Sequence, residues 1–267
     1  MTASSVEPRP AAPGRAAPLA GSWARLSAAL PGLRIHGAPP RSGGGWTAAA
    51  DLAGGGAALD AMIAFDAELG LELYGRAARP DVTAGFCLHR YTWPLALAFT
   101  VPWFLERRVP RLPVERVSVN RSTGELTAQP VEFACLPDDP AAAAPGARVV
   151  PDEAALRAEL LAAVAEHLTP VLAAFRPRVR RGPHTLWAMT TDDVVEGLWY
   201  VGGLLGEEDR ATAELDALLP AGPGHRPFVG AAGFRRADGR WLRDRVSCCL
   251  YYTVRPEEAC LSCPREK

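Results

Sequence analysis

The sequence predicts an α+β protein that is mainly helical, with β-hairpins and a cysteine-rich C-terminal segment. Three observations support this fold class. Apolar residues recur at helical spacing over long stretches in both halves of the chain. Two short stretches alternate instead and contain hairpin turns, and most of the cysteines lie after residue 247. Helices with segregated hairpins are typical of the α+β class.

The composition is that of a globular protein with an ample core. The chain has 267 residues, of which 48% are hydrophobic. The net charge of -1 gives no overall basic field that would attract nucleic acid. Lys267 is the only lysine, so all other basic residues are arginines. We attribute this bias, together with the high Ala, Gly and Pro content, to base composition, which weakens arginine clusters as evidence for a binding patch.

We divide the chain into four regions. Residues 1–20 contain several prolines and no continuous apolar run, which predicts a disordered tail and no secretory signal. Residues 21–145 form an N-terminal region of helices and a hairpin, residues 146–240 a second helical region, and residues 241–267 the cysteine-rich segment. The boundary near residue 145 depends on a low-complexity linker, DDPAAAAPGARVVP.

The first half contains three predicted helices and a hairpin. The first helix is SWARLSAALPGL, which ends at Pro31-Gly32, and the second is AALDAMIAFDAELGLELYG. Residues 81–106 continue as helix, bent at Pro94 and Pro102. Because this stretch is interrupted by prolines and ends in charge, we interpret it as buried and expect no integral membrane segment. The stretch RVSVNRSTGELTAQPVEFACLP alternates and turns at NRSTGE, which predicts a hairpin.

The second half contains three more helices and a second hairpin. Pro151 suits the first position of a long amphipathic helix with Leu156 and Leu160 on one face. The stretches HTLWAMTTDDVVEGLWYVGGLLG and EEDRATAELDALLP predict two further helices. Asp238-Gly239 is the strongest two-residue hairpin signal in the sequence, and its second strand runs towards the cysteines.

Four cysteines make the most informative motif of the chain. Cys248, Cys249, Cys260 and Cys263 follow the pattern Cys-Cys-x10-Cys-x2-Cys. We expect a cytoplasmic protein, in which clustered thiols indicate a metal site rather than disulfides. Four thiolates suffice for a tetrahedral zinc or for a 2Fe–2S cluster. Neighbouring side chains of a strand point to opposite faces, and zinc sites use pairs two to four residues apart, so the adjacent pair favours iron–sulfur while zinc remains an alternative.

With its lead-in RVSCCLYY, this pattern resembles the ferric siderophore reductase family (FhuF-like), whose members end in a 2Fe–2S domain of the same cysteine spacing. The helical stretch TLWAMTTDDVVEGL is similar to a Leu-Trp helix of the same proteins. The resemblance implies that each of the four cysteines is a ligand of a 2Fe–2S cluster. It also implies one-electron reduction of a ferric siderophore, with release of Fe(II) in the cytoplasm.

The remaining expectations concern substrate and partners. Neither SGGGW nor LAGGGAALD fits a dinucleotide fingerprint, so we expect electrons from a partner such as a ferredoxin or a flavin reductase. We place the protein in the cytoplasm, either free or at the inner face of the membrane. No catalytic residue is assigned beyond the cluster. Two rival functions are a zinc-stabilised interaction module and an iron–sulfur sensor. As substrate contacts we assign Tyr251, Tyr252, Arg255, Arg243 and Arg245, for which packing tyrosines and solvated arginines are the alternative.

Other reactive side chains receive structural interpretations. Cys87 and Cys135 are expected to be buried, inert thiols. The pair Asp192-Asp193 is interpreted as an exposed helical pair, with a pocket position as the alternative. The histidines are dispersed without metal-site spacing, so each is expected to be structural: His36, His89, His167, His184 and His225.

Overall fold

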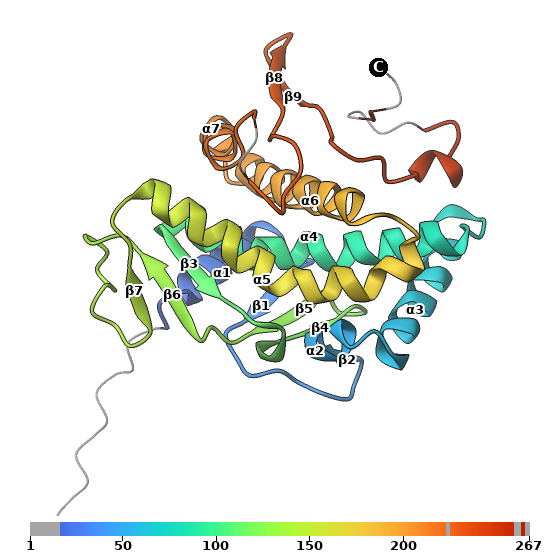
Figure 1. The fold of residues 1–267 in the computed structure, drawn as a ribbon, viewed down its shortest axis with the longest axis horizontal. Helices are drawn as coiled ribbons and strands as arrows, with labels where there is room; N and C mark the ends of the chain where they lie inside the picture. The colour runs from blue at the N-terminus through green and yellow to red at the C-terminus, as the bar shows by residue number, and fades with distance from the viewer. Residues whose placement is uncertain (1–16, 223–224, 259–262, 265–267) are drawn as a thin grey trace, which may run out of the picture.

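The computed structural model describes residues 17–222, 225–258 and 263–264, and it confirms a mainly helical α+β fold (Figure 1). Most of the expected N-terminal tail, residues 1–16, lies outside the described residues, as does Cys260. The α-helices are α1 Ala20–Ala29, α2 Ala49–Ala53, α3 Ala57–Tyr74, α4 Pro80–Glu106, α5 Glu153–Val179, α6 Pro183–Leu204 and α7 Glu208–Leu218.

The described strands form three small sheets. In the first, the order is β1-β5-β4-β2, and the antiparallel pair β4–β5 is the hairpin expected at NRSTGE. The second has the order β3-β6-β7, and β7 lies within the stretch expected to be a linker. The strands are β1 Arg34–His36, β2 Trp46–Ala48, β3 Arg108–Arg111, β4 Val117–Asn120, β5 Glu125–Ala128, β6 Glu132–Cys135, β7 Ala147–Val149, β8 Phe234–Ala237 and β9 Arg240–Arg243.

The third sheet is the hairpin β8–β9, which the sequence predicted at Asp238-Gly239. Asp238 has a φ of 51° and Gly239 a φ of 75°. Positive φ at both central residues is the requirement of a type I′ turn, which Asp-Gly meets at low cost. The hairpin therefore forms for the local reason that the sequence indicated, and it leads the chain towards the cysteines.

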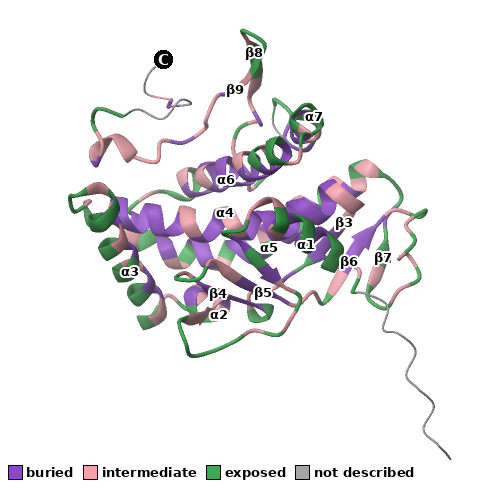
Figure 2. Cartoon of the chain, turned by 180° about the vertical axis from the view of Figure 1, so that it is seen from behind, coloured by how far each residue is buried: buried purple, intermediate pink, exposed green. Residues whose placement is uncertain are grey.

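Helix α4 lies at the centre of the molecule, between α5 and α6 and against α1 and α3 (Figure 1). It runs through both of its prolines, Pro94 and Pro102, and most of its residues are buried (Figure 2). Its thiol, Cys87, is buried, as is Cys135 on β6, so both expectations are confirmed. Burial raises the pKa of the Cys87 thiol well above its ordinary value, which keeps it protonated and unreactive.

Helix α5 begins later than the sequence predicted. Asp152 is its N-cap and accepts a hydrogen bond from the backbone N–H of Ala155 at 2.8 Å, so Pro151 precedes the helix instead of starting it. The predicted apolar face is confirmed, since Leu156 and Leu160 are fully buried. In the part of the chain that the structure describes, α5 is the one helix long and apolar enough to cross a membrane by length and composition.

The packing of α5 is that of a core helix. His167, near its middle, has no exposed surface. Its Nδ1 donates to the carbonyl oxygen of Leu112 at 2.6 Å, and its Nε2 accepts from the hydroxyl of Tyr91 at 2.8 Å. Burial lowers the pKa of His167 to about 4, so the ring is neutral. This buried polar pair fixes α5 against α4. The division of the chain at residue 145 stays a prediction.

Candidate active site

The approach to the cysteine pair is fixed to α6 by one buried carboxylate, that of Asp192. Its oxygens accept hydrogen bonds from the backbone N–H groups of Val246 at 2.9 Å and Ser247 at 2.8 Å. They also accept from the Ser247 hydroxyl and from Arg243 Nη2, each at 2.6 Å. A carboxylate with this many donors is strongly held, so Asp192 determines where the chain enters the cysteine motif.

The expectation that Asp192 and Asp193 form an exposed pair is wrong. Their exposed fractions are 0% and 2%. The reason is that α6 is buried on nearly all of its faces, against α4 on one side and under residues 243–247 on the other. A charged side chain in the middle of such a helix must be paired, and its partners come from distant parts of the chain.

Arg243 completes the attachment from the other side. Its side chain has no exposed surface, and it donates to Asp192, to Glu196 at 3.0 Å and to the carbonyl oxygen of Ala232 at 2.9 Å. Arg243 is therefore neither the solvated arginine nor the substrate contact that the sequence suggested, because every direction of its guanidinium faces protein. Its role is to neutralise the buried carboxylates.

Arg245 lies in the same network but faces the cysteines. Its Nε is 3.4 Å from Glu196 and 3.7 Å from Asp192, and 11% of its side chain is exposed. Burial disfavours the charge of the guanidinium, but the attraction of Glu196 and Asp192 outweighs it and raises the pKa of Arg245 above its ordinary value. The thiol of Cys249 interacts electrostatically with this cation.

A second attachment follows the cysteine pair. Leu250 adopts a left-handed conformation with a φ of 63°, and the short 3-10 helix η2 Tyr251–Thr253 begins there. Val254 is buried against Val82 and Phe86 at the start of α4. Figure 1 shows the C-terminal segment running from β9 along α6 to the ends of α3 and α4. Cys248 and Cys249 therefore lie between two points at which the chain is fixed.

The described cysteines have the donor chemistry that a 2Fe–2S cluster needs. Cys248, Cys249 and Cys263 are free thiols, and the first two are half-buried. The chain around the pair forms no regular strand, which allows neighbouring thiols to turn to one side. Among the residues described, no three His, Cys, Asp or Glu side chains are grouped as metal ligands. Because Cys260 lies outside that set, the assignment of the four ligands stays a prediction.

A cavity of about 400 Å³ opens beside Cys249, between α4, α6 and the C-terminal segment; we call it the cysteine-side cavity. Arg245 and Tyr251 line it, so the structure brings two predicted substrate contacts to the cysteine pair. Aromatic walls come from Tyr74 on α3, whose ring lies 5.8 Å from that of Tyr251, and from Phe86 on α4. The cavity has the size and the mixed lining of a small-ligand site.

The other two predicted contacts lie beyond this cavity. Tyr252 is half-buried on η2. Arg255 donates from Nη2 to the carbonyl oxygen of Leu73 at 3.1 Å, which places its charge at the C-terminus of α3. Cations are favourable at that end of a helix, so the contact supports the second attachment of the segment.

His89, expected to be structural, and Asp193, for which a pocket position was only the alternative, both line this cavity. Nδ1 of His89, on α4, lies 2.5 Å from Oδ1 of Asp193 on α6. The carboxylate is almost fully buried, whereas 41% of the His89 side chain is exposed. Burial alone would lower the pKa of His89, but the charge and hydrogen bond of Asp193 outweigh it and raise that pKa above its ordinary value. The signal in the sequence that could have indicated this site was the pair Asp192-Asp193 within a largely apolar helix.

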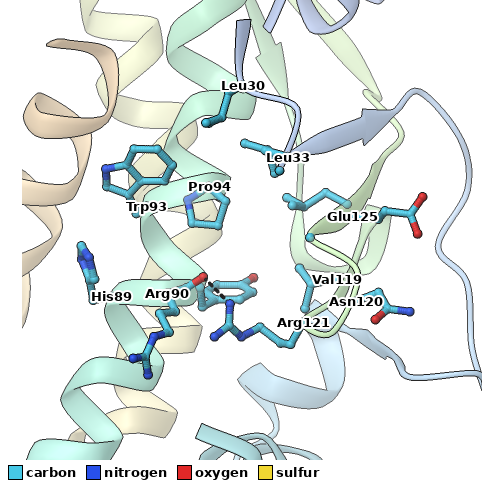
Figure 3. Close-up of a pocket in the computed structure, with 14 residues that line it drawn as sticks. Leu30, Leu33, His89, Arg90, Trp93, Pro94, Val119, Asn120, Arg121 and Glu125 are labelled. Carbon is cyan, nitrogen blue, oxygen red and sulfur yellow. Dashed lines mark hydrogen bonds between the residues drawn. The ribbon is translucent and has the colours of Figure 1, made fainter. Parts of the chain in front are cut away.

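Two further cavities adjoin the first along α4. A central cavity of about 310 Å³ also contains His89 and Arg90 in its lining (Figure 3). Arg90 and Arg121 lie at one end of it, and both bind the buried carboxylate of Asp66, at 2.7 Å and 3.0 Å. The third cavity, of about 680 Å³, shares Trp93 with the central one. The three cavities are therefore neighbours, with His89 and Arg90 shared by the first two and Trp93 by the last two.

The described part of the chain is a mainly helical protein, and its C-terminal segment carries free thiols of the kind that bind a metal or a redox cofactor. Residues 245–265 match the family model of the FhuF 2Fe-2S C-terminal domain. The chain therefore carries a C-terminal domain of this type, whose cofactor is a 2Fe–2S cluster, and the resemblance noted from the cysteine pattern is confirmed. Searches of curated proteins and of solved structures found no match to the chain.

Proposed function

We propose that the protein is a ferric-siderophore reductase. It takes single electrons from a donor protein, such as a ferredoxin or a flavin reductase, and reduces Fe(III) within a siderophore so that Fe(II) is released in the cytoplasm. The support for this function is that the match to the FhuF 2Fe-2S domain coincides with the Cys-Cys-x10-Cys-x2-Cys pattern. Cys248, Cys249, Cys260 and Cys263 are the proposed ligands.

The chemistry requires one electron per iron. Ferric iron is a hard cation that siderophores hold through oxygen ligands, and the same ligands hold ferrous iron far less strongly, so reduction releases the metal. When bound, a 2Fe–2S cluster supplies single electrons at a potential set by exposure and by hydrogen bonds to its sulfurs.

The residues of this chain supply the position and the electrostatics. Asp192 engages the N–H groups of Val246 and Ser247, so those two groups are not available as donors to sulfur. Arg245 contributes a permanent positive charge beside Cys249. The cysteine-side cavity gives a ferric complex a place to approach the half-buried pair, with Arg245 and Tyr251 as contacts.

The first test is anaerobic purification, followed by iron and zinc analysis and a visible spectrum. About two irons per chain, with absorption that bleaches under dithionite, are expected for a 2Fe–2S protein. The reduced protein is then mixed with a ferric tris-hydroxamate in the presence of a ferrous chelator, and Fe(II) formation is followed. A colourless protein with about one zinc would instead support the interaction module, and an iron–sulfur protein that reduces no siderophore would support the sensor.

Cysteine variants connect the cofactor to the activity. Cys248→Ser and Cys263→Ala should lose iron and siderophore reduction together, because a cluster needs its thiolates. Cys135→Ala is the matched control: this thiol is buried on β6, so its loss should leave the iron content unchanged. Full reductase activity in an iron-free Cys248→Ser protein would refute the proposed mechanism.

A further inference from the structure

His89 lies where the cysteine-side cavity meets the central cavity, and it lines both. Asp193 occupies its Nδ1, which therefore carries the proton of that hydrogen bond. Among the described residues, nothing accepts or donates a hydrogen bond at Nε2. Since 41% of the side chain is exposed, the open Nε2 edge of the ring is accessible to a molecule in the cavities. The fully buried His167, in contrast, has both nitrogens engaged in hydrogen bonds.

The charged groups around His89 come from each element packed against it. Asp193 and Glu196 on α6 favour the imidazolium, whereas Arg245 from the C-terminal segment opposes it. Arg90, on the same helix, is neutralised by Asp66, and the thiol of Cys249 and the phenols of Tyr74 and Tyr251 complete the cavity. The balance raises the pKa of His89, so that a proton is available on Nε2 at a higher pH than for a free imidazole.

Reduction of a ferric chelate leaves negatively charged oxygen ligands that can recapture the iron. A proton placed on such an oxygen stops this recapture, because a protonated ligand binds iron weakly. An acid within the cavity would therefore accelerate release at the moment when the charge on the iron falls. His89 is the one histidine among the described residues that line the cysteine-side cavity, and its Nε2 has no hydrogen-bond partner among them.

We propose that His89 is a catalytic acid of the reduction, which gives its Nε2 proton to a ligand oxygen of the ferric chelate, and that Asp193 is its positioning residue. The inference rests on the proposed function. In the step, Fe(III) accepts one electron from the cofactor, which an external donor protein has reduced. One Fe–O bond breaks, the N–H proton moves to the freed oxygen, and the neutral imidazole later takes a proton from water.

The experiment compares two electron acceptors. The anaerobically purified, dithionite-reduced protein is mixed by stopped flow with a ferric tris-hydroxamate, whose reduction takes up protons, or with ferricyanide, whose reduction does not. His89→Gln should slow the reaction with the hydroxamate by about 100-fold, the lower end of what a general acid contributes, and leave the reaction with ferricyanide unchanged. His184→Gln, at an exposed position at the start of α6, is the matched control and should behave as the unmodified protein.

The pH profile identifies the acid. In the unmodified protein the hydroxamate rate should fall as the pH rises through the pKa of His89, and it should decrease in deuterium oxide. In Asp193→Asn the fall should begin at lower pH, because the carboxylate that raises the His89 pKa is gone. In His89→Gln both dependences should disappear.

Each outcome separates the two proposals. Equal hydroxamate rates and pH profiles in the unmodified protein and His89→Gln would overturn the role of His89 while the reductase function stands. Reduction of ferricyanide but not of hydroxamate by the unmodified protein would refute the reductase function itself. A loss of both rates with a loss of iron in His89→Gln would show a role in holding the cofactor segment, which also overturns the proposal.

Discussion

Replacement of Asp192 by asparagine tests whether one carboxylate holds the cofactor segment to the helices. Asparagine has nearly the same shape, but it has one acceptor oxygen in place of two and presents its NH2 group to the N–H donor of either Val246 or Ser247. The fully buried Arg243 also loses its closest counter-charge, at 2.6 Å. The change therefore removes charge and acceptors together without opening a cavity.

The magnitude follows from the partners that remain. Removing one member of a buried ion pair costs about 3–5 kcal/mol, because the other charge is left uncompensated. Arg243 keeps Glu196 at 3.0 Å and the carbonyl oxygen of Ala232, which favours the lower end of that range. We expect Asp192→Asn to lower the free energy of unfolding by about 3 kcal/mol, and Asp192→Asn with Arg243→Met to be less destabilised than the single variant.

The assay is urea unfolding followed by circular dichroism, with hydrogen exchange at residues 246 and 247 as a local measurement. Asp138→Asn makes the same chemical change at an exposed loop position and should have little effect. We also expect iron to be lost from Asp192→Asn before the helices unfold. A stability within about 0.5 kcal/mol of the unmodified protein, with both amides still protected, would refute the role of this anchor.

Three further predictions concern stability. The neutral, buried His167, with a pKa of about 4 against 6.5 when free, should make the protein about 3 kcal/mol less stable as the pH falls from about 6.5 to 4, since only the unfolded chain takes up the proton there. His167→Gln should remove this slope from unfolding curves measured across that range. Gly230→Ala should cost about 2 kcal/mol in urea unfolding and loosen the cysteine segment, since its Cβ would lie 2.6 Å from Val246 at a φ of +80°; unchanged stability would contradict this packing. Gly124→Ala should lower the thermal midpoint by several degrees, because its Cβ would lie 2.1 Å from the carbonyl oxygen of Gly32.

Periodicity and turn chemistry predicted much of the fold. Leu156 and Leu160 identified the buried face of α5, and Asp238-Gly239 identified the β8–β9 turn, because each signal is local. The start of α5 was predicted at Pro151, because a proline suits the first position of a helix, but the helix starts after its N-cap, Asp152. The strand β7 was missed because three residues of an alanine-rich stretch become a strand only through pairing with β6.

The site was predicted only where its signal lay within one segment. The cysteine spacing is contiguous and gave the cofactor class, which the family match bears out. Asp192, Asp193 and His89 were misjudged because their partners are remote: 104 positions separate His89 from Asp193. A charged residue is exposed by default, and only the fold shows that Arg243 lies against Asp192.

The double attachment of the cysteine pair has a consequence for the speed of electron transfer. Every atom that shifts when charge arrives or leaves adds to the reorganisation energy of the step, and a site built in advance avoids most of that cost. Asp192 fixes the chain on one side of Cys248 and Cys249, and the contacts of Val254 fix it on the other. Under the proposed function, the thiolates of Cys248 and Cys249 are ligands held in this way, and we expect them to move little between oxidation states, so that a small driving force is enough for rapid exchange with a donor or a ferric complex.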